Sequence, residues 1–146
     1  MREMQSVPSG FDFHHIGYAT ASIDQVYRFF ERLGYRAEGD AFADPVQGVA
    51  GRFVIGGGPR IELLENLPGS HTLTPWLEAG IAMYHFAYWV DDIESALQWA
   101  KSQRGKVAVP PVPAIAFGGR RICFAIFRTR MMLEFTRLRS RFQPSP

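Results

Sequence analysis

Four polar residues lie within stretches whose neighbours are mostly apolar: His15, Glu62, His85 and Glu134. Acidic and imidazole side chains in such surroundings are rarely tolerated unless they are paired, hydrogen-bonded or bound to a metal. The spacing repeats, because the first histidine precedes the first glutamate by 47 residues and the second histidine precedes the second glutamate by 49. A lone histidine or glutamate in a strand is most often an ordinary core or surface residue. Two such pairs at matching spacing instead favour one shared site.

Two imidazoles and two carboxylates suit a borderline divalent ion such as zinc, nickel, cobalt, manganese or iron(II). Four protein ligands leave two positions of an octahedral ion open, where a substrate could chelate through two adjacent oxygens. Because a bound ion can polarise a carbonyl, this ligand set favours proton transfer at the carbon alpha to a carbonyl. Glu62 and Glu134 are the candidate catalytic bases. An extradiol-type dioxygenase would need three open positions, and Glu62 argues against it.

Three other residues are candidate substrate contacts. Arg120 and Arg121 follow a pair of glycines, and this turn could hold a phosphate or carboxylate of the substrate. A solvated hairpin turn is the alternative interpretation of the same residues. Gln47 is a weaker candidate for lining a pocket.

The two remaining histidines are not expected to be ligands. His14 directly precedes His15, and successive side chains of a regular strand point to opposite faces. We therefore expect the His14 ring to point away from the site. His71 lies in a segment rich in proline and glycine that reads as a linker.

The elements that must position these residues repeat with a period near 70 residues. The segment His15-Ile-Gly-Tyr18-Ala19 resembles His85-Phe-Ala-Tyr88-Trp89, and both runs favour strands. Each is followed by a helix-start signal, an amphipathic helical stretch and a glycine where a left-handed residue can end the helix. These start signals and glycines are Ser22 to Asp24 with Gly34, and Asp91 to Glu94 with Gly105.

Three further strand-like stretches follow each predicted helix: 35–38, 51–55 and 60–65 in the first half, and 107–109, 121–127 and 131–138 in the second. The predicted fold class is therefore α+β, with two paired βαβββ modules. We expect one domain over 11–138, with modules at about 11–66 and 81–138, a linker at 67–80 holding a short helix at 74–78, an N-terminal extension at 1–10 and a C-terminal tail at 139–146. Pseudo-twofold packing of the modules would bring the four polar residues together.

The composition limits the classes of protein that remain. A chain of 146 residues fits one domain, and 47% hydrophobic residues exclude disorder of the whole chain. No apolar run is long enough to span a membrane, and a net charge of +2 gives little support for nucleic acid or another polyanion as partner. The single Cys123 excludes an internal disulfide and a thiolate-rich zinc site. The single cysteine suits a reducing compartment, and the first ten residues lack the apolar core of a signal peptide, so we expect a cytoplasmic protein. The open positions of the expected metal site favour a small molecule as substrate.

Several segments carry a family resemblance: His15-Ile-Gly, Phe30-Glu-Arg-Leu-Gly34-Tyr, Gln47-Gly-Val49, Ile61-Glu-Leu-Leu-Glu65 and His85-Phe-Ala-Tyr-Trp-Val-Asp-Asp-Ile93. Together they resemble the vicinal oxygen chelate superfamily, which includes glyoxalases, bleomycin resistance proteins and dioxygenases. Within it they are most similar to methylmalonyl-CoA epimerases and less so to glyoxalase I. The resemblance implies a metal-centred fold of paired βαβββ modules, one divalent metal on the four residues above, and a homodimer.

By the same resemblance, the expected function is metal-dependent epimerisation or isomerisation of an acyl thioester, such as a methylmalonyl-CoA-like substrate on coenzyme A or another carrier. Two alternatives share the fold. A lactoylglutathione lyase of the glyoxalase I type would use the same four ligands, and a ligand-binding or resistance protein would perform no chemistry. The chain lacks the His-Pro turn that epimerases usually have before the last strand, and it reads Phe127-Arg-Thr-Arg130 there.

Overall fold

The computed structural model describes residues 10–137, in which two similar halves follow one another along the chain. The first half contains β1 (Phe11–Ala19), α1 (Ile23–Arg32), β2 (Arg36–Asp44), β3 (Val49–Ile55) and β4 (Ile61–Asn66). After a connecting helix, the second half contains the same kinds of element in the same order. These elements are α2 (Thr74–Ala79), then β5 (Met83–Val90), α3 (Ile93–Ser102), β6 (Lys106–Pro113), the 3-10 turn η1 (Ile115–Phe117), β7 (Arg121–Ile126) and β8 (Met132–Arg137). The predicted α+β fold of two βαβββ modules is confirmed.

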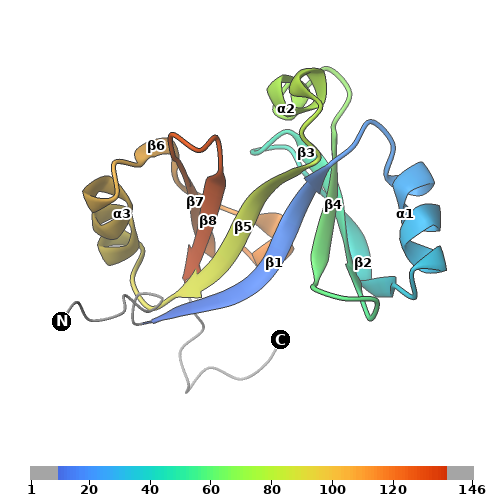
Figure 1. Cartoon of the computed structure of the whole chain (residues 1–146), viewed down its shortest axis with the longest axis horizontal. Coiled ribbons are helices and arrows are strands. Elements are labelled where there is room, and N and C mark those ends of the chain that lie inside the picture. The colour runs from blue at the N-terminus through green and yellow to red at the C-terminus, as the bar shows by residue number, and fades with distance from the viewer. Residues whose placement is uncertain (1–9, 138–146) are drawn as a thin grey trace.

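One mixed sheet of 8 strands, in the order β2-β3-β4-β1-β5-β8-β7-β6, joins the two modules (Figure 1). Within each module the first and last strands are parallel, as β1 with β4 and β5 with β8. The antiparallel pair β1 and β5 joins the modules at the middle of the sheet. The four strands that carry the candidate ligands are therefore the four central strands, so residues far apart in the sequence can meet on one face.

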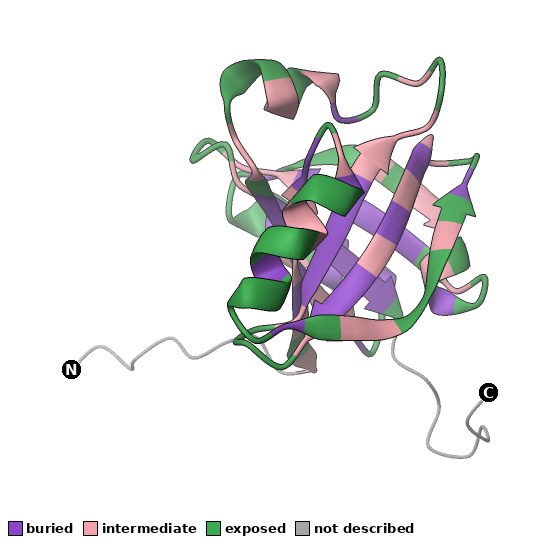
Figure 2. Ribbon diagram, turned by 90° about the vertical axis from the view of Figure 1, so that its right-hand side faces the viewer, coloured by how far each residue is buried: buried purple, intermediate pink, exposed green. Residues whose placement is uncertain are grey.

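Helices α1 and α3 cover the sheet through two matching apolar clusters. Helix α1 packs Ile23 and Phe30 against β3 and β4, and α3 packs a row of small and branched residues against β7 and β8. Both predicted helix starts are confirmed, because the side chains of Ser22 and Asp92 accept hydrogen bonds from amides of the first turn. Figure 2 shows the outer face of α1 exposed and the strands behind it largely buried. A third cluster lies on the opposite face of the sheet, around the cavity described below.

The two helices end differently, which corrects one expectation. Gly34 follows α1 with a φ of +93°, as the predicted left-handed end requires. After α3 the left-handed residue is Arg104, with a φ of 64°, and Gly105 serves another purpose. A Cβ at Gly105 would lie 2.7 Å from the Phe127 ring and 2.9 Å from the Ala100 carbonyl oxygen, so close packing requires glycine there.

Two strands extend further than the sequence pattern predicts. Strand β2 continues through Gly39 and Asp40 to Asp44, across an irregularity in its pairing with β3. Strand β6 continues through Pro110 to Pro113, which the sequence pattern had marked as a turn. Both strands lie at the edges of the sheet. In β6 this position tolerates proline, because a proline on the outer side of an edge strand removes no hydrogen bond from the sheet.

The predicted tail at 139–146 and the N-terminal extension, apart from residue 10, lie outside the described residues. Over the part of the chain that is described, no helix combines the length and apolar character needed to cross a membrane.

Candidate metal centre

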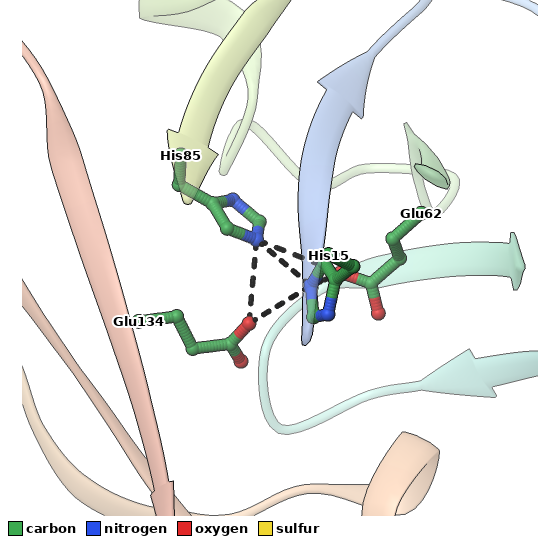
Figure 3. Close-up of side chains that lie close together, drawn as sticks. All are labelled: His15, Glu62, His85 and Glu134. Atoms are coloured by element: carbon green, nitrogen blue, oxygen red, sulfur yellow. Dashed lines mark hydrogen bonds and ion pairs between the residues drawn. The ribbon is translucent and has the colours of Figure 1, made fainter. Parts of the chain in front are cut away.

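His15, Glu62, His85 and Glu134 come from β1, β4, β5 and β8 and converge at the middle of the sheet (Figure 3). One ligand atom of each lies within 4.8 Å of the other three. The Nε2 atom of His15 is 3.2 Å from Glu62 Oε1, 3.2 Å from Glu134 Oε1 and 3.2 Å from His85 Nε2. The Nε2 atom of His85 is 3.3 Å from Glu134 Oε1 and 3.7 Å from Glu62 Oε1. The structure thus brings together all four residues that the repeat singled out.

Strand register explains this convergence. Gly17 of β1 pairs with Glu62 on one side and with His85 on the other. In the second module Ala87 of β5 pairs with Glu134 on one side and with His15 on the other. Each carboxylate therefore faces a histidine of the other module across one small residue.

Gly17, the small residue between Glu62 and His85, is essential for this arrangement. A Cβ at Gly17 would lie 1.9 Å from Cε1 and 2.2 Å from Nδ1 of His85. No side chain occupies such a distance, so glycine at this position leaves the space into which the His85 ring fits. The Tyr84 and Phe124 rings contact the same imidazole, at centroid distances of 4.5 and 5.2 Å.

All four candidate ligands are buried, with exposed fractions between 0% and 5%. Burial opposes the charged form of His15, but the carboxylates of Glu62 and Glu134 outweigh it and raise the pKa of His15 to about 9. Burial likewise opposes ionisation of Glu134, yet the two histidines lower the pKa of this carboxyl to about 2. The negative charge of the carboxylates therefore favours a cation in the cluster, either a proton on His15 or a metal ion.

Several observations fit a metal ion at this position. Oε1 of Glu134 is buried without a hydrogen-bond partner among the described residues, although it points at two histidine nitrogens. Ligand atoms at roughly 2.1 Å from one ion would lie about 3.0 Å apart as neighbours and about 4.2 Å apart as opposites. The separations that involve a histidine Nε2 atom, 3.2 to 3.7 Å, are close to the first value. Two imidazoles and two carboxylates are also a donor set that zinc and its neighbours accept.

His14 contradicts the prediction that its ring points away from the site. Its Nδ1 atom lies 2.8 Å from Nδ1 of His15, within hydrogen-bonding distance. The reason is a β-bulge: Phe13 pairs with Tyr88 and His15 with Ala87, so His14 has no residue opposite it and strand alternation is interrupted. Burial, together with the neighbouring His15 and Arg60, lowers the pKa of His14 to about 4.

A cavity of about 390 Å³ opens onto Glu62, His85 and Glu134. Its remaining wall is largely apolar and aromatic, and it is formed by both modules and by the segment that connects them. Members of this wall include Phe42, Val49, Trp76, Tyr84, Phe117 and Phe124. The cavity can therefore hold a small molecule with one polar end at the four donors and an apolar body.

Gln47 lines this cavity, and its position depends on a residue that the sequence analysis missed. The buried carboxylate of Asp44 accepts hydrogen bonds from the Gln47 side-chain amide at 2.8 Å and from the backbone amides of Val46 and Gln47. It also accepts one from the backbone amide of Ile115, in the second module, at 3.2 Å. The Asp44-Pro sequence could have indicated a local turn, but not the contact 71 residues away.

Thr72, in the connecting segment, was also missed. Its hydroxyl donates to the backbone carbonyl of Gln47 at 2.7 Å, and its side chain lines the cavity. The loop that carries Gln47 is therefore held by Thr72 as well as by Asp44.

Arg120 and Arg121 are not among the described residues that line the cavity. A guanidinium nitrogen of Arg120 donates to the Phe117 carbonyl at 3.0 Å, and this guanidinium lies 6.0 Å from the centroid of the Trp89 ring. Arg121 is an exposed residue at the start of β7. A substrate phosphate or carboxylate at this turn would lie outside the cavity.

The sequence matches the Glyoxalase/Bleomycin resistance protein/Dioxygenase superfamily over residues 14–124. The chain therefore belongs to this superfamily, as its motifs predicted. The matched range contains three of the four clustered residues and ends before Glu134. No curated protein matches the chain significantly.

Several solved structures have the same fold, and some of them are enzymes of stated activity. A hypothetical protein of Bacillus halodurans C-125 has a TM-score of 0.75 and 28% identity, over 92% of this chain and 99% of the other. Methylmalonyl-CoA epimerase of Mycobacterium tuberculosis has a TM-score of 0.70 and 20% identity, over 96% and 94%. A variant of the Streptomyces coelicolor methylmalonyl-CoA epimerase, in complex with 2-nitronate-propionyl-CoA, has a TM-score of 0.66 and 17% identity, over 90% and 100%. At these identities the likeness to the epimerases is a likeness of fold.

Proposed function

We propose that this chain is a metal-dependent epimerase or isomerase that moves a proton on the carbon alpha to a carbonyl. The observation that carries the proposal is the buried cluster of two imidazoles and two carboxylates at one end of an apolar cavity. His15, Glu62, His85 and Glu134 would hold one divalent ion of zinc, cobalt, nickel, manganese or iron. Such an ion supplies Lewis acidity, which stabilises negative charge on a carbonyl oxygen when the neighbouring carbon loses its proton.

We propose that the two carboxylates act on the proton itself. Glu62 projects from β4 of the first module and Glu134 from β8 of the second, and they approach the cluster from different sides in Figure 3. Inversion at a carbon requires a proton to leave one face and a proton to return to the other. A pair of carboxylates from two sides of one cavity supports this reaction, with one group as base and the other, once protonated, as acid.

We propose an acyl thioester as substrate, of a methylmalonyl-CoA-like type. Methylmalonyl-CoA epimerases share the fold over at least 90% of this chain, and one of them was crystallised with a propionyl-CoA analogue. The cavity of about 390 Å³ has room for a short acyl group, while a carrier would extend beyond it. Gln47 offers an amide at the wall for a polar substrate group.

We propose a homodimer in the cytoplasm, in line with the family resemblance and the single buried cysteine. The mass of the purified full chain in solution, measured by light scattering, tests the dimer. A mass close to 16.5 kDa at micromolar concentration would contradict it.

Exchange of the alpha hydrogen in D₂O tests the function. The protein is reconstituted with cobalt(II) or zinc(II), incubated with methylmalonyl-CoA, and deuterium incorporation is followed by mass spectrometry. We expect exchange that depends on protein and on metal, with protein treated with a chelator as the control.

Two results would overturn this function in different ways. No exchange with any 2-substituted acyl thioester, together with turnover of methylglyoxal plus glutathione, would assign the chain to the lactoylglutathione lyases. Less than about a tenth of an equivalent of bound metal after reconstitution would favour a ligand-binding or resistance protein without metal chemistry.

A further inference from the structure

The bulge in β1 places a second histidine beside the candidate metal ligand. Because His14 has no residue opposite it on β5, its ring turns to the same face of the sheet as the ring of His15. Their Nδ1 atoms are 2.8 Å apart, and the ring planes are inclined by 83°. One nitrogen must donate and the other accept, so the contact contains one shared proton.

The position of His14 is fixed from two sides. A bulge leaves backbone groups outside the regular ladder, and the His14 carbonyl oxygen accepts instead from a guanidinium nitrogen of Arg60 at 3.2 Å. Arg60 is itself held by two hydrogen bonds to the Glu38 carboxylate, at 2.8 and 3.0 Å. The ring packs edge-on against three aromatic rings at centroid distances from 5.0 to 5.8 Å, those of Trp89, Phe53 and Phe117.

The direction of the shared hydrogen bond decides whether His15 can bind a metal. If His14 donates, a neutral His15 carries its proton on Nε2, the atom that faces Glu62 and Glu134, and this nitrogen has no free lone pair. If His15 donates from Nδ1, its Nε2 lone pair points into the cluster. Only the second arrangement provides a ligand.

We propose that His14 is a positioning residue, which accepts the Nδ1 proton of His15 and so holds the His15 imidazole in the tautomer and orientation that bind the metal. The inference rests on the proposed metal site. A hydrogen-bond acceptor of this kind commonly contributes a factor of 10 to 100 to metal affinity. It also keeps the ligand ring from turning away when no metal is bound.

Two variants of similar size separate this role from simple packing. His14→Leu removes the acceptor, whereas His14→Asn places an oxygen at about the position of Nδ1. His71→Leu, at an exposed position in the connecting segment, is the control. Zinc affinity at pH 7.5 is measured by competition with a chromophoric chelator. We expect His14→Leu to bind zinc 10- to 100-fold more weakly than the wild type, His14→Asn to recover most of this loss, and His71→Leu to bind as the wild type does.

Nitrogen NMR of the zinc-loaded protein labelled with ¹⁵N-histidine gives a readout that packing alone would not change. We expect a slowly exchanging proton on Nδ1 of His15 in the wild type and in His14→Asn, and rapid exchange of it in His14→Leu. The Nδ1 atom of His85 is buried without a partner among the described residues, so its signal is an internal reference that should not respond. The wild-type spectrum alone tests the proposal if His14→Leu does not fold.

These measurements distinguish a failure of the proposed metal site from a failure of the proposed role of His14. Wild-type protein that binds no zinc would overturn the metal site, and the role of His14 with it. Tight binding by the wild type, with equal affinity and an equally protected proton in His14→Leu, would leave the metal site intact and overturn the role of His14.

Discussion

The two modules treat their candidate metal ligands differently although they are built alike. Each ligand histidine follows a residue that lies at an irregularity of the β1–β5 pairing, His14 before His15 and Tyr84 before His85. His14 hydrogen-bonds its neighbour, whereas the Tyr84 ring packs edge-on against His85 and leaves Nδ1 of His85 without a partner among the described residues.

The difference shows how one repeated unit can serve two tasks at one site. In the first module the bulge residue orients a ligand through a hydrogen bond. In the second, a hydrophobic wall orients the ligand, and Tyr84 also lines the cavity where a substrate would bind. The two similar modules therefore each provide one imidazole and one carboxylate, and the residues beside the two imidazoles differ: one makes a hydrogen bond and the other lines the cavity.

The largest expected effect concerns the two carboxylates, one from each module. Glu134→Gln and Glu62→Gln each remove a candidate proton-transfer group and a metal ligand, and we expect each to lower alpha-hydrogen exchange by at least a factor of about 10³. Glu65→Gln on the same strand as Glu62 is the matched control, since Glu65 is outside the cluster. Exchange is measured by deuterium incorporation. Full exchange by either cluster variant would mean that the base is misassigned.

A second pair of variants compares the two small residues between donors. In Gly17→Ala the new methyl group would occupy the place of the His85 ring, so the ring must turn out of the cluster. We expect a folded protein that binds zinc at least about 100-fold more weakly, because one ligand is displaced. Ala87→Gly, opposite His15, removes a buried methyl group and should cost about 1 kcal/mol of unfolding free energy.

Competition with the chromophoric chelator measures both affinities, and circular dichroism confirms the fold. Zinc affinity in Ala87→Gly should stay within about threefold of the wild type. Equal loss of affinity in both variants would contradict the different packing of the two histidines.

The pH dependence of the metal-free protein tests the electrostatics of the first module. The pKa of His15 is raised to about 9 from 6.5, so the folded state holds a proton that the unfolded chain releases. Its contribution is complete below about pH 6.5 and is lost as pH rises through about 9, a decrease on the order of 3 kcal/mol. Urea unfolding of the metal-free wild type and of His15→Gln, at several pH values, measures this decrease in unfolding free energy. If the unfolding free energy changed equally with pH in the two proteins, His15 would not be the source of the decrease.

Metal binding should show the opposite trend, because the ion must displace that proton. We expect zinc affinity to rise between pH 6.5 and 9 in the wild type. Affinity that is constant over this range would contradict a proton on His15.

The smallest expected effect compares the two helix starts. The Asp92 side chain accepts from two amides, those of Glu94 and Ser95, whereas Ser22 accepts from one amide, that of Gln25, and all three distances are 3.3 Å. We expect both Ser22→Ala and Asp92→Ala to lower the thermal midpoint by a few degrees, with the larger decrease for Asp92→Ala. Calorimetry of the metal-free protein measures both. A larger decrease for Ser22→Ala would contradict this ranking.

The convergence of the four donors could be predicted from the sequence because the information is repeated. A histidine early in each module and a glutamate in its last strand occur at nearly equal spacing, and two similar modules tend to pair about a twofold axis. The helices were predictable for a local reason, since each start signal lies within three residues of the amides that it caps.

Other features could not be predicted, because they depend on contacts between distant residues. Regular alternation placed His14 on the wrong face, and no glycine beside it indicates a bulge. The prolines of β6 suggest a turn unless the strand is known to lie at the edge of the sheet. The carboxylate of Asp44 binds the amide of Ile115, a contact between modules that no local pattern reveals.

The most direct test of the account is a crystal structure of the zinc-loaded protein, with anomalous diffraction recorded at the zinc absorption edge. We predict one strong anomalous peak about 2.0 to 2.2 Å from a donor atom of each of the four clustered residues. A peak at another place, such as the exposed His71, with none between His15 and His85, would contradict it.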